Sequence, residues 1–119
     1  MRATLGNTLN GSNPKARYNI YVVELDNAVL SERRFVERNP DYREGSPCVY
    51  IGMTFRTPEE RFEQHKSGYK AAKYVRKYGQ RLKPRQYRSH NPMTYEDACK
   101  MEREKARRLR NRGYGVWQN

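Results

Sequence analysis

Two short segments rich in β-branched and aromatic residues constrain most strongly what this chain can fold into. Residues 18–25 read YNIYVVEL and residues 48–54 read CVYIGMT. Apolar side chains that alternate at a period of two are typical of β-strands. The alternation gives each segment a face that carries a tyrosine, Tyr21 in the first and Tyr50 in the second. If the two strands pair, both hydroxyls can point from one face of a sheet.

The composition bears on whether the chain folds into a stable domain. Leu, Ile, Val and Phe make up only 15% of the chain, and that low fraction with a formal net charge of +12 would by itself favour disorder. Ten tyrosines oppose that interpretation, because each can bury its ring and keep its hydroxyl hydrogen-bonded. The length of 119 residues is that of one domain. We therefore expect a single domain over residues 18–119, after a flexible segment 1–17 and with an insert at about 26–47.

Helix start and stop signals predict the remaining elements of secondary structure. Thr57-Pro58-Glu59-Glu60 combines a capping residue, a proline at the first helical position and a glutamate three residues after the cap. This pattern predicts a helix over residues 58–67 that ends at Gly68. The other expected elements are a short helix over 31–39 capped by Ser31, a helix over 70–78, a strand or basic loop over 80–88, a long helix over 95–112 that starts at Thr94, and a last strand over 114–119. Together they predict a small α/β (α+β) domain with a mainly antiparallel three-stranded sheet flanked by helices.

Charge and composition exclude several classes of protein. No apolar run approaches the roughly 20 residues that span a bilayer, and the N-terminus lacks the apolar stretch of a secretory signal. Two cysteines, Cys48 and Cys99, are too few for a disulfide framework, and with His65 and His90 they match no zinc-finger spacing. The positive charge predicts a polyanionic partner, most simply nucleic acid. We expect a cytoplasmic protein that binds DNA, with RNA as the alternative.

The helix over residues 58–67 carries the most reactive pair of side chains. Arg61 and His65 are four residues apart, so they lie on one face of the helix. Arginine has a planar charged fork that suits phosphate oxygens, and histidine exchanges a proton near neutral pH. The alternative is a solvated helix face on which Arg61 pairs with Glu60 or Glu63. For the two strand tyrosines the alternative is a purely structural role, because tyrosine is a good strand residue.

A metal-dependent nuclease also needs a carboxylate. Glu102 follows Ala98 by one turn on the long helix and borders its apolar stripe, so we expect it to point toward the sheet. Glu104 is expected to face solvent. The alternative for Glu102 is an ordinary ion pair on a basic helix.

This ordered combination of residues resembles the GIY-YIG nuclease superfamily. The resemblance rests on NIY at 19–21, YIGMT at 50–54, R-x-x-x-H-x-x-G at 61–68 and DACKME at 97–102, and it covers about residues 18–119. The chain departs from the family pattern in two places. Asn19 stands where the family usually has glycine, and 28 residues separate the two tyrosines, more than the family usually has. An insert would explain the spacing, because loops accept insertions at small entropic cost.

The resemblance implies an endonuclease that uses one Mg²⁺ (or Mn²⁺) to hydrolyse DNA phosphodiester bonds. Tyr21 and Tyr50 would flank the scissile phosphate, and one of them would help to activate the attacking water. Arg61 would neutralise charge that develops on the phosphoryl oxygens, and His65 would accept or relay a proton from a tyrosine or the water. Glu102 would hold the cation next to the leaving 3′ oxygen. Magnesium keeps most of its waters, so a single protein carboxylate is an ordinary ligand set.

Three further residues follow from the same resemblance. Gly52 would let the backbone approach closely, and Thr54 would be a structural member of the site. The family often has an asparagine near the C-terminal end of the site, and Asn119 is the candidate for it. A second hypothesis is a non-catalytic nucleic-acid-binding protein with the same scaffold, and a third is a ribosome-associated basic protein.

Two basic segments are candidates for nucleic-acid contact. Residues 70–88 alternate basic and aromatic side chains, and residues 103–112 are the densest basic run. The alternative is a solvated helix face for the basic run and a core role for the tyrosines. The candidate contact residues are Lys66, Lys70, Lys73, Arg107 and Arg110.

Overall fold

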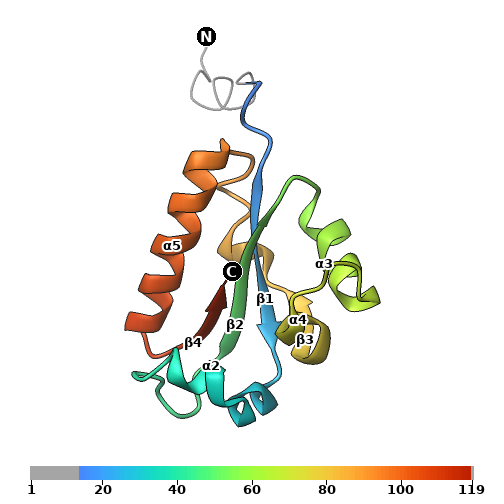
Figure 1. The fold of residues 1–119 in the computed structure, drawn as a ribbon. Helices are drawn as coiled ribbons and strands as arrows, with labels where there is room; N and C mark the ends of the chain where they lie inside the picture. Colours follow the sequence, from blue (N-terminus) through green and yellow to red (C-terminus); the bar gives the residue numbers. More distant parts are fainter. Residues whose placement is uncertain (1–13, 119) are drawn as a thin grey trace.

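One mixed sheet of four strands forms the centre of the fold. A computed structural model describes residues 14–118, so the predictions for residues 1–13 and for Asn119 lie outside the described part (Figure 1). The strands are β1 (Asn19–Leu25), β2 (Cys48–Thr54), β3 (Gly79–Leu82) and β4 (Gly115–Gln118), in the order β3-β1-β2-β4. β1 pairs antiparallel with β2 and β3, whereas β4 pairs parallel to β2. The α+β class is confirmed, but the expected three antiparallel strands are corrected to four in a mixed sheet.

The pairing of β1 with β2 follows the apolar alternation. Tyr21 lies opposite Gly52, and Val23 lies opposite Tyr50. Side chains two residues apart on a strand point to the same face. Tyr21 and Tyr50 therefore share one face of the sheet, despite the long segment between them.

The helices begin and end close to their sequence signals. α3 (Pro58–Ser67) starts with a reciprocal capping box between Thr57 and Glu60, and it ends at Gly68 in the left-handed region, at φ 92°. α4 (Lys73–Tyr78) starts three residues later than predicted. The long helix α5 spans Tyr95–Asn111 and is capped by the Thr94 hydroxyl. A further single turn, η2, spans Pro84–Gln86.

The segment between β1 and β2 contains two short helical turns, η1 (Asn27–Ser31) and α2 (Arg33–Glu37). The prediction that Ser31 caps a helix here is wrong. Asp26 caps η1 instead, because its carboxylate accepts the Ala28 N–H two residues further on. The Ser31 hydroxyl donates backward to the carbonyl of Ala28, and α2 begins with no side-chain cap.

Helices cover both faces of the sheet. Figure 1 shows α5 on one side of β1 and β2, and α3 with α4 on the other. On the α5 side, Cys99 Sγ lies 3.9 Å from Met53 Sδ. On the other side, the His65 ring of α3 lies 5.6 Å from the Tyr50 ring, centroid to centroid. Within residues 14–118 no helix has the length and apolar character needed to cross a membrane.

Candidate functional site

Tyr21 and Tyr50 meet over a glycine on the face that α3 covers. Their ring centroids are 6.0 Å apart. A Cβ at Gly52 would lie 2.7 Å from Tyr21 Oη and 2.8 Å from Tyr50 Cε2, closer than such atoms can approach. Gly52 therefore makes room for the two rings, which is a different reason for glycine than the close backbone approach that the sequence predicted.

His65 fixes the hydroxyl of Tyr21. Its Nε2 lies 2.7 Å from Tyr21 Oη, and its Nδ1 accepts the backbone N–H of Ala72 at 3.0 Å. A backbone N–H can only donate, so Nδ1 carries no proton and the neutral ring carries its proton on Nε2. Burial, with a smaller effect from Arg61, lowers the pKa of His65 to about 4. The imidazole is therefore neutral near pH 7 and donates its Nε2–H to Tyr21 Oη.

This tautomer bears on the role predicted for His65, which stays a prediction. Because Nε2 already carries a proton in this structure, the ring donates to Tyr21 Oη and cannot in this state accept a proton from it. Burial and the neighbouring Tyr50 raise the pKa of Tyr21, whereas Arg61 acts in the opposite direction. In the closed structure Tyr21 is thus a neutral phenol held in place by a histidine donor.

Arg61 is held by the segment that covers the cluster. Its guanidinium donates to the backbone carbonyls of Tyr69 at 3.2 Å and Lys70 at 2.7 Å, and to Gln64 Oε1 at 3.2 Å. Within residues 14–118 no ion pair joins Arg61 to Glu60 or Glu63, so the predicted alternative pairing of Arg61 with one of these glutamates is wrong. Arg61 instead fastens α3 to the segment that connects α3 with α4.

The resulting cluster is closed to solvent. Tyr21 is 1% exposed, and both Tyr50 and His65 are 0% exposed. Residues 68–72 provide both the carbonyls that hold Arg61 and the N–H that holds His65. A phosphate can reach the tyrosine hydroxyls only if a movement exposes them. Thr54 is 8% exposed and ends β2, where its hydroxyl accepts the N–H of Arg56 at 3.0 Å.

Glu102 lies on α5, on the opposite side of the sheet. As predicted, it faces the buried side of its helix, where it is 9% exposed. Within residues 14–118 its carboxylate makes no hydrogen bond or ion pair, which rules out the ordinary ion pair considered above, and no contact joins it to the tyrosines, Arg61 or His65. Burial raises the pKa of Glu102 to about 7, and Arg103 opposes that shift. Glu104, expected in solvent, is half-buried and lines a cavity beside His90.

The basic candidates divide into two groups. Lys66 donates to the carbonyls of Arg76 and Gly79 at the end of α4, so it acts as a helix cap. Arg110 donates to Asn39 Oδ1 and the Val116 carbonyl and anchors β4. The structure uses these donors internally, and nucleic-acid contact by Lys66 and Arg110 stays a prediction. The three remaining candidates, Lys70, Lys73 and Arg107, are exposed.

Sequence reasoning missed an aromatic cluster next to the tyrosine pair. In the parallel register of β2 and β4, Trp117 lies beside Tyr50 and shares its face. Trp117 contacts Tyr74 at a centroid distance of 4.8 Å and Phe35 at 6.3 Å. The available signal was the YGVWQN ending, but only the parallel register shows which face Trp117 occupies.

Comparisons of the chain with protein-family models, curated proteins and solved structures gave no match. A functional assignment therefore depends on the geometry of these side chains and on the charge of the chain.

Proposed function

We propose that this protein is a metal-dependent endonuclease of the GIY-YIG type that hydrolyses phosphodiester bonds in DNA. The observation that carries the proposal is the convergence of Tyr21, Tyr50, Arg61 and His65 around the 2.7 Å contact between Tyr21 and His65. These residues come from two strands and a helix. The net charge of +12 supplies attraction for a polyanionic substrate.

Opening of residues 68–72 would convert the closed cluster into a reactive one. Water entry removes the desolvation that is the largest cause raising the pKa of Tyr21, and Arg61 then favours the phenolate while Tyr50 opposes it. Tyr21 is then the side chain best placed to accept the proton of the attacking water. The same motion releases the Arg61 guanidinium from two carbonyls, so its donors become available to phosphoryl oxygens.

The chemistry of Glu102 fits a magnesium ligand. A buried carboxylate with no hydrogen bond within residues 14–118 offers the oxygen donors that Mg²⁺ prefers, and Mg²⁺ needs few of them because it retains waters. Within the same residues no group of three His, Cys, Asp or Glu side chains offers a preformed cage. A Mg²⁺ held by Glu102, or Mn²⁺ in its place, would supply positive charge to a substrate phosphate on the α5 side of the sheet, across the sheet from Tyr21 and Tyr50.

Incubation with supercoiled plasmid tests the proposal. We expect nicking that requires Mg²⁺ and falls by about 100-fold in Tyr50→Phe. Glu102→Ala should abolish the metal-dependent nicking while DNA binding in a gel shift survives. Tyr114→Phe and Glu104→Ala are matched controls and should nick like the wild type. Nicking by Glu102→Ala at the wild-type rate would remove Glu102 from the site.

The closed cluster itself favours one second candidate. Tyr21, Tyr50 and His65 are almost completely buried, as expected of a polar core in a non-catalytic nucleic-acid-binding protein. A gel shift without nicking in the same experiment supports this candidate. Tight RNA binding that is unchanged in Arg61→Gln would instead indicate the ribosome-associated protein.

A further inference from the structure

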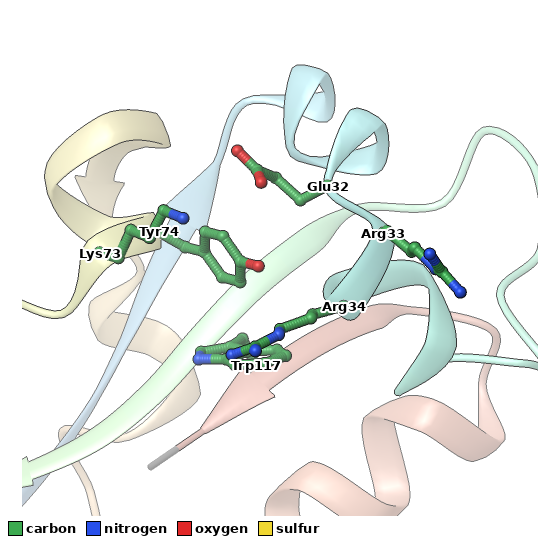
Figure 2. A pocket seen from close by; sticks show the side chains of 6 residues that line it. All are labelled: Glu32, Arg33, Arg34, Lys73, Tyr74 and Trp117. Carbon is green, nitrogen blue, oxygen red and sulfur yellow. The ribbon is translucent and has the colours of Figure 1, made fainter.

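A cavity with an aromatic wall and a cationic rim lies on the same side of the sheet as the tyrosine cluster. Its volume is about 440 Å³, and Figure 2 shows the six side chains that line it. They come from the η1–α2 segment, α4 and β4, and they are Glu32, Arg33, Arg34, Lys73, Tyr74 and Trp117.

The aromatic wall is fixed by its neighbours. The rings of Tyr74 and Trp117 meet edge to face at 73°, and Phe35 packs against both. Tyr74 is 4% exposed and Trp117 is half-buried. Figure 2 shows the Tyr74 hydroxyl directed into the cavity, and within residues 14–118 this hydroxyl makes no hydrogen bond. Such a wall presents a rigid apolar surface with a polar tip.

The cations at the rim are available to a ligand. Within residues 14–118, neither Arg34 nor Lys73 makes a side-chain hydrogen bond or an ion pair, and Figure 2 shows Arg34 alongside Trp117. The guanidinium carbon of Arg38, outside the cavity lining, lies 4.9 Å from the centroid of the Trp117 ring, and Lys73 Nζ lies 6.0 Å from the centroid of the Tyr74 ring. The one acidic member, Glu32, is already compensated by Lys77.

That compensation is direct. Glu32 Oε2 accepts the Lys77 ammonium at 3.1 Å and the Tyr78 hydroxyl at 2.6 Å, and these contacts lower its pKa. Arg33 points away in Figure 2 and pairs with Glu37. The uncompensated charge of the cavity is therefore positive and comes from Arg34, with Lys73 beside it. A planar aromatic ligand that carries a negative charge matches this combination.

We propose that this cavity binds one unpaired nucleotide of a nucleic-acid strand, with its base against Tyr74 and Trp117 and its phosphate at Arg34 and Lys73. The proposal rests on the proposed nuclease function and adds a subsite to it. Trp117 lies beside Tyr50 in the sheet register, and Lys73 follows the residue whose N–H binds His65. A nucleotide held here lies next to the cluster assigned to the chemistry, so a substrate with an unpaired nucleotide near the cleaved bond is preferred.

The only tryptophan of the whole chain lies in this cavity, which gives a direct readout. We expect a short single-stranded oligodeoxythymidylate, titrated into the full chain in EDTA, to quench the fluorescence of Trp117 with saturation. A blunt duplex of equal length should quench it less, and inorganic phosphate should not quench it. Equal quenching by inorganic phosphate would indicate an anion site without base recognition and would overturn the proposal.

Charge variants test the rim without disturbing the wall. Arg34→Gln and Lys73→Gln should each weaken binding of the oligonucleotide and reduce the slope of log affinity against log salt by about 0.7, the value for one phosphate contact on a single strand. Lys100→Gln, an equal charge change on α5, is the control for loss of general attraction. Slopes that match that control would refute the rim assignment. Trp117→Leu should weaken binding about 10-fold in fluorescence anisotropy, and unchanged affinity would refute the stacking wall.

The two proposals fail in distinguishable ways. Binding is measured in EDTA, so it needs no cleavage. Quenching without plasmid nicking at any Mg²⁺ concentration refutes the nuclease and retains the nucleotide site. Nicking by a protein whose Trp117 fluorescence does not respond to the single strand refutes the nucleotide site and retains the nuclease.

Discussion

His65 and Glu102 give opposite pH dependences to the stability of the fold. Burial lowers the pKa of His65 from 6.5 to about 4, so between these values the unfolded chain binds the extra proton. Burial raises the pKa of Glu102 from 4.5 to about 7, so between those values the folded chain binds the extra proton. Stability contributed by His65 is complete above its unfolded pKa and is lost as the pH falls. Stability linked to Glu102 protonation is gained over nearly the same range.

The two effects are similar in size. Between about pH 7 and about pH 5, the titration of His65 lowers the free energy of unfolding by about 2 kcal/mol. Over the same interval Glu102 raises the free energy of unfolding by about 2 kcal/mol. The two contributions therefore largely cancel in the wild type and become visible only when one group is removed.

Urea unfolding in EDTA at the two pH values measures each contribution. Glu102→Gln should become less stable by about 2 kcal/mol on acidification, because only His65 then titrates in this range. His65→Gln should become more stable by about the same amount, and Glu104→Gln should follow the wild type. If Glu102→Gln and His65→Gln both follow the wild type, burial does not shift these groups and the reasoning is refuted.

Three local predictions test the geometry around the cluster and the start of α3. Gly52→Ala should lower the free energy of unfolding by about 1–3 kcal/mol, because its Cβ meets Tyr21 Oη at 2.7 Å; an unchanged urea midpoint would contradict this contact. Ala72→Pro keeps the backbone φ of −69° but removes the N–H that His65 Nδ1 accepts, so nitrogen NMR should show the Nε2–H tautomer in the wild type and a mixture in the variant. Thr57→Ala should lower the free energy of unfolding by about 1 kcal/mol and leave nicking unchanged; wild-type stability would show that the capping box contributes little.

Local sequence signals were sufficient for much of the fold. The period-two segments became β1 and β2, and the capping sequence at Thr57 became the start of α3, because each signal acts within a few residues. The shared face of Tyr21 and Tyr50 followed from alternation once the two strands paired. The parallel position of β4 was not predictable in this way, because it depends on how α5 returns the chain to the sheet.

The failures in the site have a common physical cause. Arg61 is held by the carbonyls of Tyr69 and Lys70, and His65 is held by the N–H of Ala72. These partners are backbone groups, which every residue type carries, so the sequence does not indicate which of them a side chain contacts. The number of charged residues likewise could not show that the Lys66 ammonium donates hydrogen bonds to backbone carbonyls at the end of α4. What a polar side chain contacts depends on tertiary structure, whereas its place on a helix or strand face depends on local spacing.

Stability alone does not account for the polar groups in this thin core. Burial disfavours the charged form of His65 enough to lower its pKa to about 4, and Glu102 is buried with no partner within residues 14–118. Apolar residues of similar size at such positions are often neutral or stabilising. His65 is such a buried group with a strongly lowered pKa, and it lies beside Tyr21 and the Arg61 guanidinium, as expected of a candidate functional site. Glu102 lies across the sheet from that cluster, so the Glu102 and His65 variants test the two faces of the sheet separately.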